Sequence, residues 1–352
     1  MMELNCLCDI YSGYAFKSFN DTSDGIPVIK IGNILSDGTI ELTDCVYTEE
    51  VPKEKYYSKK DDIYIALSGA TTGKIGVMQT DGLYVINQRV GIIRNKGKIP
   101  NDYLKYFLVS KSNQILKEAS GCAQPNISPK QISKYDISIQ TEEKMLLITQ
   151  QLKKIEVILQ NYRNQIDLLD ELVKARFVEM FGDMKPTVKL NKYIIELRAG
   201  KSLAGNEICK NKVLKTGAAT FGFFDKDQYK YYPKEYKPNP LHKVETGDVI
   251  ISRMNTPELV GACSYVYEAP DNTYYPDRLW KVIVNENTNP IFLWQLMWQQ
   301  EIRKQIKENS YGTSGTMNNI SKIKLLNINA IDVPISLQNQ FADFVKEVDK
   351  SR

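Results

Sequence analysis

Residues 142–182 read EEKMLLITQQLKKIEVILQNYRNQIDLLDELVKARFVEMFG, and the only glycine in this stretch is its last residue. The stretch contains no proline, and eight of its apolar residues recur in alternating steps of four and three: Ile148, Leu152, Ile155, Leu159, Tyr162, Ile166, Leu169 and Val173. This spacing is typical of the heptad seam of a coiled coil. Thr141 is placed to cap the helix, and Gly182 and Pro186 are placed to end it. The sequence predicts one helix of about 40 residues, roughly 60 Å long.

A helix of this length cannot bury an apolar seam by itself. The alternative, a helix buried in the core of one small domain, is disfavoured because the helix outruns such a core. We therefore expect a partner helix, from the same chain or from another.

The segments before and after this helix repeat each other weakly but in the same order. The matched stretches, first half against second, are 28–32 with 213–217, 61–68 with 247–252, 75–76 with 260–261, 88–89 with 277–278, 124–128 with 317–321, and 136–139 with 332–335. The offset grows from 185 to 196, as insertions in loops would produce. Six matches in order predict two copies of one domain.

Each flanking segment has the pattern of a mixed α/β domain. Strands are expected at 28–31, 62–68, 84–94, 248–252 and 280–284, and helices at 100–119 and 290–309. The predicted class is α+β, with two similar mixed α/β domains joined by a long coiled-coil helix. The predicted boundaries are 1–141 for the first domain, 142–184 for the helix, 185–336 for the second domain, and 337–352 for the start of a second helix.

Composition narrows the chemistry. His242 is the only histidine, so histidine-based acid–base catalysis and His-rich metal sites are disfavoured. The six cysteines include no C-x-x-C pair, which argues against a structural zinc site, and Cys6 and Cys8 are expected to share one buried strand face. No apolar run is long enough to span a membrane, so we expect a cytoplasmic protein without a membrane partner. The net charge of +4 is compatible with a polyanion partner without requiring one.

The order of domain, long helix, domain and second helix resembles the specificity subunit of type I restriction–modification systems over essentially the whole chain. The second half carries the resemblance in GDVIISRMNTPELVG at 247–261, DRLW at 277–280 and GTMNNIS at 315–321. The first half carries it in SGATTGKIG at 68–76 and GCAQPNIS at 121–128. Each motif is soft, and their combination with the repeat and the helix is specific.

The resemblance implies a non-catalytic DNA-binding subunit with two target-recognition domains. Each domain would read one half of a bipartite, asymmetric sequence in double-stranded DNA, and the helices would set the unread spacer. The subunit would dock two methyltransferase subunits and then restriction subunits. S-adenosylmethionine, ATP and Mg would be held by those partners, and this chain would hold no cofactor and no metal.

Residue types in the loops suit DNA recognition, because Arg pairs with guanine edges, Asn and Gln with adenine edges, and Ser or Thr with either bases or phosphates. The predicted base-reading residues are Thr71, Thr72, Lys74, Gln88, Arg89, Arg253, Asn255, Thr256 and Arg278. Further DNA-binding candidates in the same motifs are Ser68, Gln124, Asn126, Ser252, Asn318 and Asn319. The predicted phosphate contacts are Lys30, Lys130, Lys215 and Lys322. For Asn126 and Asn319, an equally good alternative is that the side chain caps a turn or helix.

Motifs that resemble catalytic signatures are incomplete. The stretch 69–75 is one residue short of a phosphate-binding loop, and 200–202 lacks the first glycine of that loop. No complete enzymatic motif was found, so no catalytic residue is predicted. Two other readings stay open: a specificity subunit of another restriction class or of a standalone methylation complex, and a coiled-coil adaptor that binds no DNA.

The second helix is expected to begin a seam with Phe344 and Val348, but the sequence ends at Arg352. By the repeat, its counterpart would continue for about 25 further residues. We therefore expect a shortened form, natural or engineered, whose exposed seam pairs with another copy or with the modification subunits.

Overall fold

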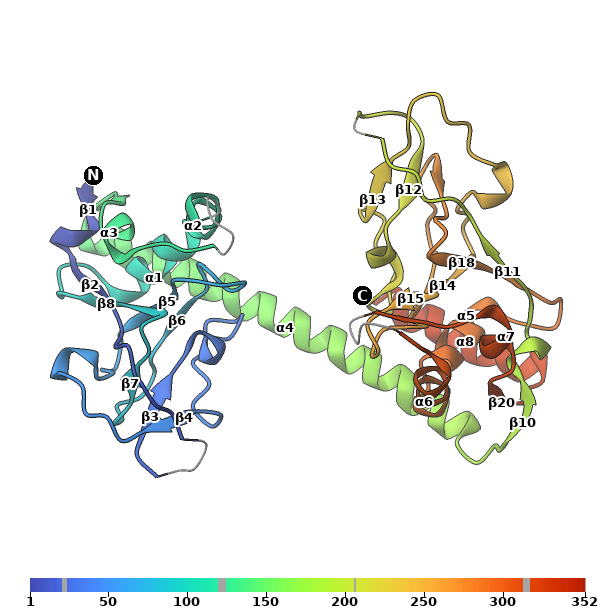
Figure 1. Ribbon diagram of the computed structural model, residues 1–352, viewed down its shortest axis with the longest axis horizontal. Helices are drawn as coiled ribbons and strands as arrows, with labels where there is room; N and C mark the ends of the chain where they lie inside the picture. Colours follow the sequence, from blue (N-terminus) through green and yellow to red (C-terminus); the bar gives the residue numbers. More distant parts are fainter. Residues whose placement is uncertain (21–23, 120–124, 206, 313–316, 352) are drawn as a thin grey trace. The chain divides into compact units, whose positions relative to one another are not determined.

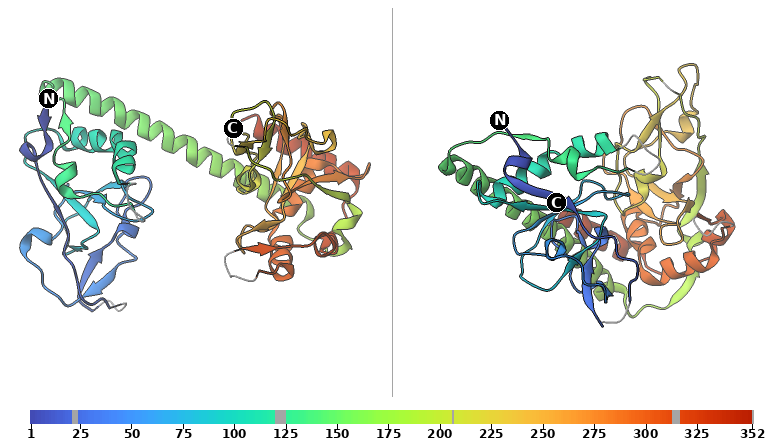
Figure 2. Two further views of the ribbon diagram at one scale, coloured as in Figure 1. Left: turned by 45° about the horizontal axis from the view of Figure 1, so that its top comes forward. Right: turned by 60° about the vertical axis from the view of Figure 1, so that its left-hand side comes forward.

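The computed structural model describes residues 1–20, 24–119, 125–205, 207–312 and 317–351. The chain divides into two compact units, Met1–Tyr162 and Arg163–Arg352, called unit 1 and unit 2 below. The division falls inside helix α4 (Glu142–Phe181), which is one unbroken helix of 40 residues (Figures 1 and 2). The predicted α+β class and the long helix are confirmed.

Unit 1 contains short strands and short helices in addition to its part of α4. Its strands are β1 (Met2–Glu3), β2 (Cys8–Ser12), β3 (Ile26–Ile29), β4 (Val46–Thr48), β5 (Ile63–Ala66), β6 (Ile75–Val77), β7 (Val85–Ile86), β8 (Val90–Asn95) and β9 (Asp136–Ile137). Its helices are α1 (Asn101–Ser110), α2 (Ser112–Ala119) and α3 (Pro129–Ile132).

Unit 2 follows the same plan. Its strands are β10 (Pro186–Lys189), β11 (Ile194–Ala199), β12 (Lys212–Leu214), β13 (Tyr229–Tyr231), β14 (Val249–Ser252), β15 (Met254–Asn255), β16 (Cys263–Tyr265), β17 (Thr273–Tyr274), β18 (Leu279–Val284), β19 (Asn318–Asn319) and β20 (Asn329–Ile331). Its helices are α5 (Pro290–Met297), α6 (Gln300–Asn309), α7 (Lys322–Leu326) and α8 (Ile335–Asp349).

The two units have the same sheet topology, as the sequence repeat predicts. Each has a four-stranded antiparallel sheet, in the order β2-β8-β5-β6 in unit 1 and β11-β18-β14-β16 in unit 2. Each also has a three-stranded sheet that contains one parallel pair, in the order β4-β3-β7 and β13-β12-β17. A two-stranded pairing, β1-β9 or β10-β20, joins the start of each repeat to its end.

One of the two inner strands of each four-stranded sheet, β5 in unit 1 and β14 in unit 2, is buried on both faces. In β5, Ile63 and Ile65 join the apolar cluster under helix α1, while Tyr64 and Ala66 join a second cluster on the opposite face. Successive side chains of a strand point to opposite faces, so a strand covered on both sides needs an unbroken apolar run. The IYIA of β5 supplies such a run, and in the VIIS of β14 the run of three apolar residues ends at the buried Ser252.

Burial along α4 changes from its ends to its middle. The Thr141 hydroxyl accepts a hydrogen bond from the Lys144 amide at the first turn, as predicted. Met145 is buried in unit 1, whereas Phe177 and Phe181 are buried in unit 2. Between these ends, the seam residues Ile155, Leu159, Tyr162 and Ile166 are exposed. Ile148, Leu152 and Leu169 are half-buried, and Val173 is buried.

Helix α8 packs against the C-terminal part of α4 inside unit 2. The ring of Phe341 lies 5.4 Å from Phe177 and 5.6 Å from Phe181, centroid to centroid. One turn further along α8, the guanidinium of Arg176 lies 5.6 Å from the ring of Phe344. A residue later in α8 therefore contacts a residue earlier in α4, so the two helices run antiparallel.

Four local predictions were wrong. The helix predicted over 100–119 is split between α1 and α2 at Lys111, and the one over 290–309 is split between α5 and α6. The strand predicted over 84–94 is two strands, β7 and β8, which belong to different sheets. Cys6 is exposed in a short 3-10 helix (Leu4–Cys6) and only Cys8 is buried, so the two do not share a strand face. None of the described helices is both long and apolar enough to cross a membrane.

Candidate nucleic-acid interface

Three loops that the sequence singles out converge in unit 2. The amide of Arg253, directly after β14, donates to the carbonyl of Arg278 at 3.0 Å. The amide of Ile320 donates to the carbonyl of Arg253 at 3.1 Å. The end of β14, the loop before β18 and the Asn-Asn-Ile-Ser segment therefore form one cluster, and β15 and β19 pair directly beside it. Figure 1 labels β14, β15 and β18 in this part of unit 2.

The same three loops converge in unit 1, through equivalent hydrogen bonds. The amide of Leu67 donates to the carbonyl of Arg89, and the amide of Ile127 donates to the carbonyl of Leu67, both at 2.9 Å. An isolated bridge between Ser68 and Asn126 stands where unit 2 has the β15–β19 ribbon. The repeat read from the sequence is thus reproduced bond for bond at the candidate site.

Side chains in the unit 2 cluster hold one another. The Nε of Arg253 donates to Oδ1 of Asn319 at 3.4 Å, and the Arg253 guanidinium lies 5.8 Å from the ring centroid of Trp280. The Nδ2 of Asn255 donates to the Thr220 hydroxyl at 3.3 Å. Arg253 and the two asparagines are half-buried. The hydrogen bond to Asn319 and the contact with the Trp280 ring orient the Arg253 guanidinium in the absence of a ligand.

Other unit 2 candidates differ in accessibility. Thr256 and Arg278 are exposed, and the Nδ2 of Asn318 donates to the Ser310 hydroxyl at 2.9 Å. Ser252 is completely buried, and its hydroxyl donates to the carbonyl of Met254 at 3.3 Å. Ser252 therefore supports the β15 turn from inside the unit.

In unit 1, the threonine-glycine loop is built around a buried hydroxyl. Thr72 donates to the carbonyl of Gly69 at 2.7 Å and to that of Pro125 at 3.3 Å, which ties this loop to the Pro-Asn-Ile-Ser segment. Thr71 and Lys74 are half-buried and line a surface hollow of about 400 Å³. The exposed members of the unit 1 cluster are Gln88, Arg89 and Asn126. Gln124 lies outside the described residues.

The capping alternative for the two asparagines is wrong for the neighbouring helices. Ser128 caps α3 by accepting from the Gln131 amide, and Ser321 caps α7 by accepting from the Lys324 amide. The serine two residues after each asparagine does the capping, and Asn319 instead accepts from Arg253.

The four predicted phosphate contacts occupy equivalent places in the two units. Lys130 and Lys322 are exposed in the first turn of α3 and α7. Lys30 and Lys215 each follow the middle strand of a three-stranded sheet. Lys215 is exposed, whereas the Lys30 ammonium lies 4.1 Å from the ring centroid of Phe19.

Sequence reasoning missed two residues that shape the unit 2 cluster. Trp280 is buried beneath Arg253. From the sequence alone, a tryptophan inside a buried strand is expected to be a core residue. The Ser202 hydroxyl donates to the Asp277 carboxylate and accepts from the Asp277 amide at 3.2 Å, which anchors the loop that carries Arg278. Ser202 and Asp277 are 75 residues apart in the sequence, so no local pattern predicts that they are in contact.

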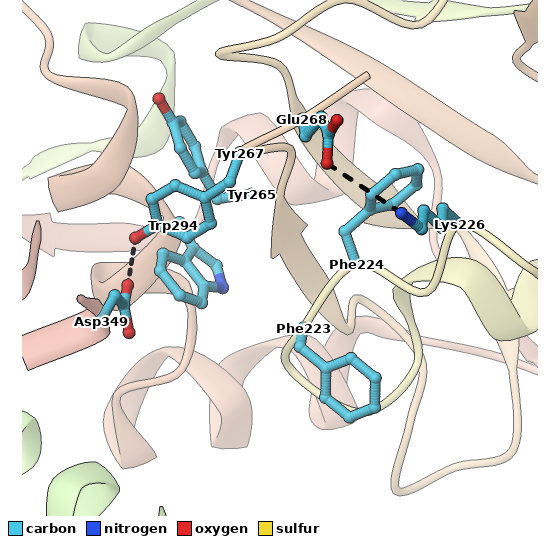
Figure 3. Close-up of a pocket in the computed structure, with 8 residues that line it drawn as sticks. All are labelled: Phe223, Phe224, Lys226, Tyr265, Tyr267, Glu268, Trp294 and Asp349. Atoms are coloured by element: carbon cyan, nitrogen blue, oxygen red, sulfur yellow. Dashed lines mark hydrogen bonds and ion pairs between the residues drawn. The ribbon is translucent and has the colours of Figure 1, made fainter. Parts of the chain in front are cut away.

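A second feature of unit 2 is an aromatic hollow of about 300 Å³, whose polar groups pair with one another (Figure 3). The Tyr267 hydroxyl donates to the Asp349 carboxylate beside the Trp294 indole, and Lys226 forms an ion pair with Glu268 at 4.0 Å. The Trp294 Nε1 donates to the carbonyl of Gly222 at 3.1 Å. The hydrogen bond between Tyr267 and Asp349 links the end of α8 to the segment that follows β16.

Comparisons with known proteins agree with the duplicated architecture. Residues 1–174 match the model of the type I restriction modification DNA specificity domain. This half of the chain belongs to the type I restriction–modification specificity family. The family predicted from the motifs is thereby confirmed, and with it a role in DNA specificity. No curated protein matches the chain.

One solved structure extends the likeness to the whole chain. The S subunit of a type I restriction–modification system from M. genitalium is 14% identical with a TM-score of 0.53, over 99% of this chain and 89% of that one. At this identity the match shows a shared fold, and the shared fold includes unit 2. A chain from a study of assembly and conformational transition in the type I R-M system has 16% identity and a TM-score of 0.45, with coverages of 99% and 90%. The HsdS subunit from Thermoanaerobacter tengcongensis has 14% identity and a TM-score of 0.38, with coverages of 99% and 88%.

Proposed function

We propose that this protein is the non-catalytic sequence-reading subunit of a type I restriction–modification complex, and that each unit reads one half of a bipartite, asymmetric DNA target. The observation that carries the proposal is the duplicated cluster. Equivalent hydrogen bonds hold the same three loops in both units, while the side chains on the loops differ. A common scaffold with different polar side chains suits two readers of different half-targets.

The exposed or half-buried polar residues of each cluster are the proposed base-reading groups. They are Ser68, Thr71, Lys74, Gln88, Arg89 and Asn126 in unit 1, and Arg253, Asn255, Thr256, Arg278 and Asn318 in unit 2, where Asn319 holds Arg253. Lys130, Lys215 and Lys322 are proposed to contact phosphates, because an exposed ammonium adds affinity for any sequence.

Partners supply the chemistry in this proposal. Two methyltransferase subunits would bring S-adenosylmethionine and extrude the target base from the duplex, and restriction subunits would bring ATP and Mg. This chain would hold no cofactor and would act in the cytoplasm, with its DNA. The exposed α4 seam, with Ile155 and Leu159 each 51% exposed, is an apolar surface suited to a helix of another chain.

A genome-wide map of methylated adenines, with and without this gene, tests the proposal. We expect deletion to remove methylation from one asymmetric two-part motif. A map that does not change would overturn the proposal. A salt titration of DNA binding by the assembled complex separates a DNA reader from a coiled-coil adaptor, since phosphate contacts make affinity fall steeply as salt rises.

A further inference from the structure

Leu67 of unit 1 and Arg253 of unit 2 occupy the same position in the repeated fold. The hydrogen bonds described above give each of them an arginine carbonyl and an isoleucine amide as backbone partners. One unit therefore places an apolar side chain where the other places a guanidinium. This position is a point at which the two units differ chemically inside a shared scaffold.

The neighbouring strand explains the difference. In unit 1, Ile65 of β5 pairs with Gly91, and in unit 2 the corresponding Ile251 pairs with Trp280. A Cβ added to Gly91 would lie 2.7 Å from Cγ2 of Ile65 and 3.0 Å from Cδ2 of Leu67, so these two side chains share the space that the glycine leaves. Trp280 fills that space in unit 2, and Arg253 places its guanidinium over the indole.

Arg253 is held without a carboxylate partner. Arg94, Arg176 and Arg198 each form an ion pair with a carboxylate, but among the described residues none forms one with Arg253. Its Nε donates to Asn319. The two terminal nitrogens of a guanidinium held by Nε present a parallel pair of N–H groups, and this pair matches the O6 and N7 of guanine. An arginine held both by a ring contact and through its Nε loses little further freedom when it binds.

We infer that Arg253 reads a guanine in the half-target of unit 2, and that Trp280 and Asn319 are positioning residues that aim its guanidinium. The inference rests on the proposed DNA-reading function. Unit 1 has no counterpart, because Leu67 is buried and apolar. The requirement for a G·C pair at this point therefore belongs to one half of the target only.

The test uses the full chain assembled with its methyltransferase subunits. Binding is measured to duplexes that carry the methylated motif, with each base pair of both halves replaced in turn. For Arg253→Lys, we expect the preference for G·C at one position of one half to fall about tenfold or more, since Lys cannot make the bidentate contact. Asn319→Ala should reduce the same preference, and Asn319→Gln, which keeps a neutral amide acceptor for Nε, should reduce it less.

Arg198→Gln is the matched control, because it removes one positive charge from the same unit, where the half-buried Arg198 forms an ion pair with the exposed Glu196. It should leave every base preference unchanged. If Arg253→Lys weakens all duplexes equally, or weakens none while the complex still selects its motif, this inference fails and the proposed function stands. If the unaltered complex shows no sequence preference, the proposed function fails first. Circular dichroism confirms that each variant is folded.

Discussion

The Arg94 guanidinium donates to both carboxylate oxygens of Asp62, at 2.6 and 2.7 Å, and Asp62 is almost completely buried. Its counterpart in unit 2, Asp248, lies 3.0 Å from the Lys281 ammonium. By strand register Lys281 corresponds to Ile92, two residues before Arg94 on the same face of the sheet. Each unit thus buries one carboxylate, directly before β5 or β14. Each carboxylate forms an ion pair with a cation, but the two cations stand at different positions of the repeat.

Breaking the unit 1 pair is expected to be costly. Asp62→Ala would leave the Arg94 guanidinium without its carboxylate and the Lys59 amide without its acceptor. Removing one partner of a buried ion pair costs about 3–5 kcal/mol. We therefore expect the free energy of unfolding of unit 1, measured by urea titration, to fall by about that amount.

Glu54→Ala provides the control, because Glu54 forms an exposed ion pair with Lys59 at 3.7 Å. Exposed pairs contribute about 0–1 kcal/mol, so this variant should unfold nearly as the parent does. Equal effects of the two substitutions would contradict the buried role of Asp62.

The order of elements was predictable because it depends on local patterns. The heptad of α4, the apolar runs of β5 and β14, and the matched motifs of the two halves are each readable within a short window. The points at which the two predicted helices and the strand predicted over 84–94 are interrupted could not be predicted in this way. The backbone leaves β7 for β8 at Asn87–Arg89 because the two strands join different sheets, which depends on partners distant in sequence.

The site was predictable in its loops and less so in its side chains. Arg253, Arg278 and Asn319 were identified from motifs, and their loops converge. The burial of Thr72 and Ser252 was not foreseen, since a polar residue in a loop motif reads as exposed. The support from Trp280 depends on strand register, which the sequence does not state.

Gly13 of unit 1 and Gly200 of unit 2 occupy the same position in the repeated fold. Alanine at either position tests how closely the backbone there packs against the segment that leads into the loop of Arg89 or Arg278. A Cβ on Gly13 would lie 2.3 Å from the carbonyl oxygen of Ile86, and one on Gly200 would lie 1.8 Å from that of Tyr275. These carbonyls precede the loops of Arg89 and Arg278. Gly13→Ala and Gly200→Ala should each lower stability by about 1–3 kcal/mol or more, through overpacking against backbone. Thermal unfolding and DNA binding are the measurements.

Gly32→Ala is the control for these two variants. A Cβ on Gly32 meets no atom within 4 Å. The variant should keep the melting temperature and the DNA affinity of the parent. Tolerance of alanine at Gly13 or Gly200 would show that the chain does not pass so close to the loop.

The cysteines near the N-terminus should differ in reactivity. Cys6 is exposed, whereas burial raises the pKa of the Cys8 thiol to about 12. Burial also raises the pKa of Cys263. Since only the thiolate reacts, iodoacetamide at pH 8 should modify Cys6 rapidly and spare the other two until the protein unfolds. Mass spectrometry of peptides after timed labelling measures the rates, and equal rates at Cys6 and Cys8 would contradict the buried start of β2.

The exposed part of the α4 seam should matter for association and not for folding. Ile155 and Leu159 are half exposed, so replacing both with Ser should change the free energy of unfolding by less than about 0.5 kcal/mol. The same double variant should lose affinity for the methyltransferase subunits, or for a second copy, because it removes apolar surface that a partner helix would bury.

Phe177→Ala is the contrasting variant on the same helix. Phe177 is buried among Phe181, Phe292 and Phe341, so this substitution should cost about 3–5 kcal/mol of stability. Light scattering at micromolar concentration, without and with the methyltransferase subunits, reports association. A monomer without them would exclude pairing between copies, and an Ile155/Leu159 variant that binds them as the parent does would exclude this part of the seam as their docking surface.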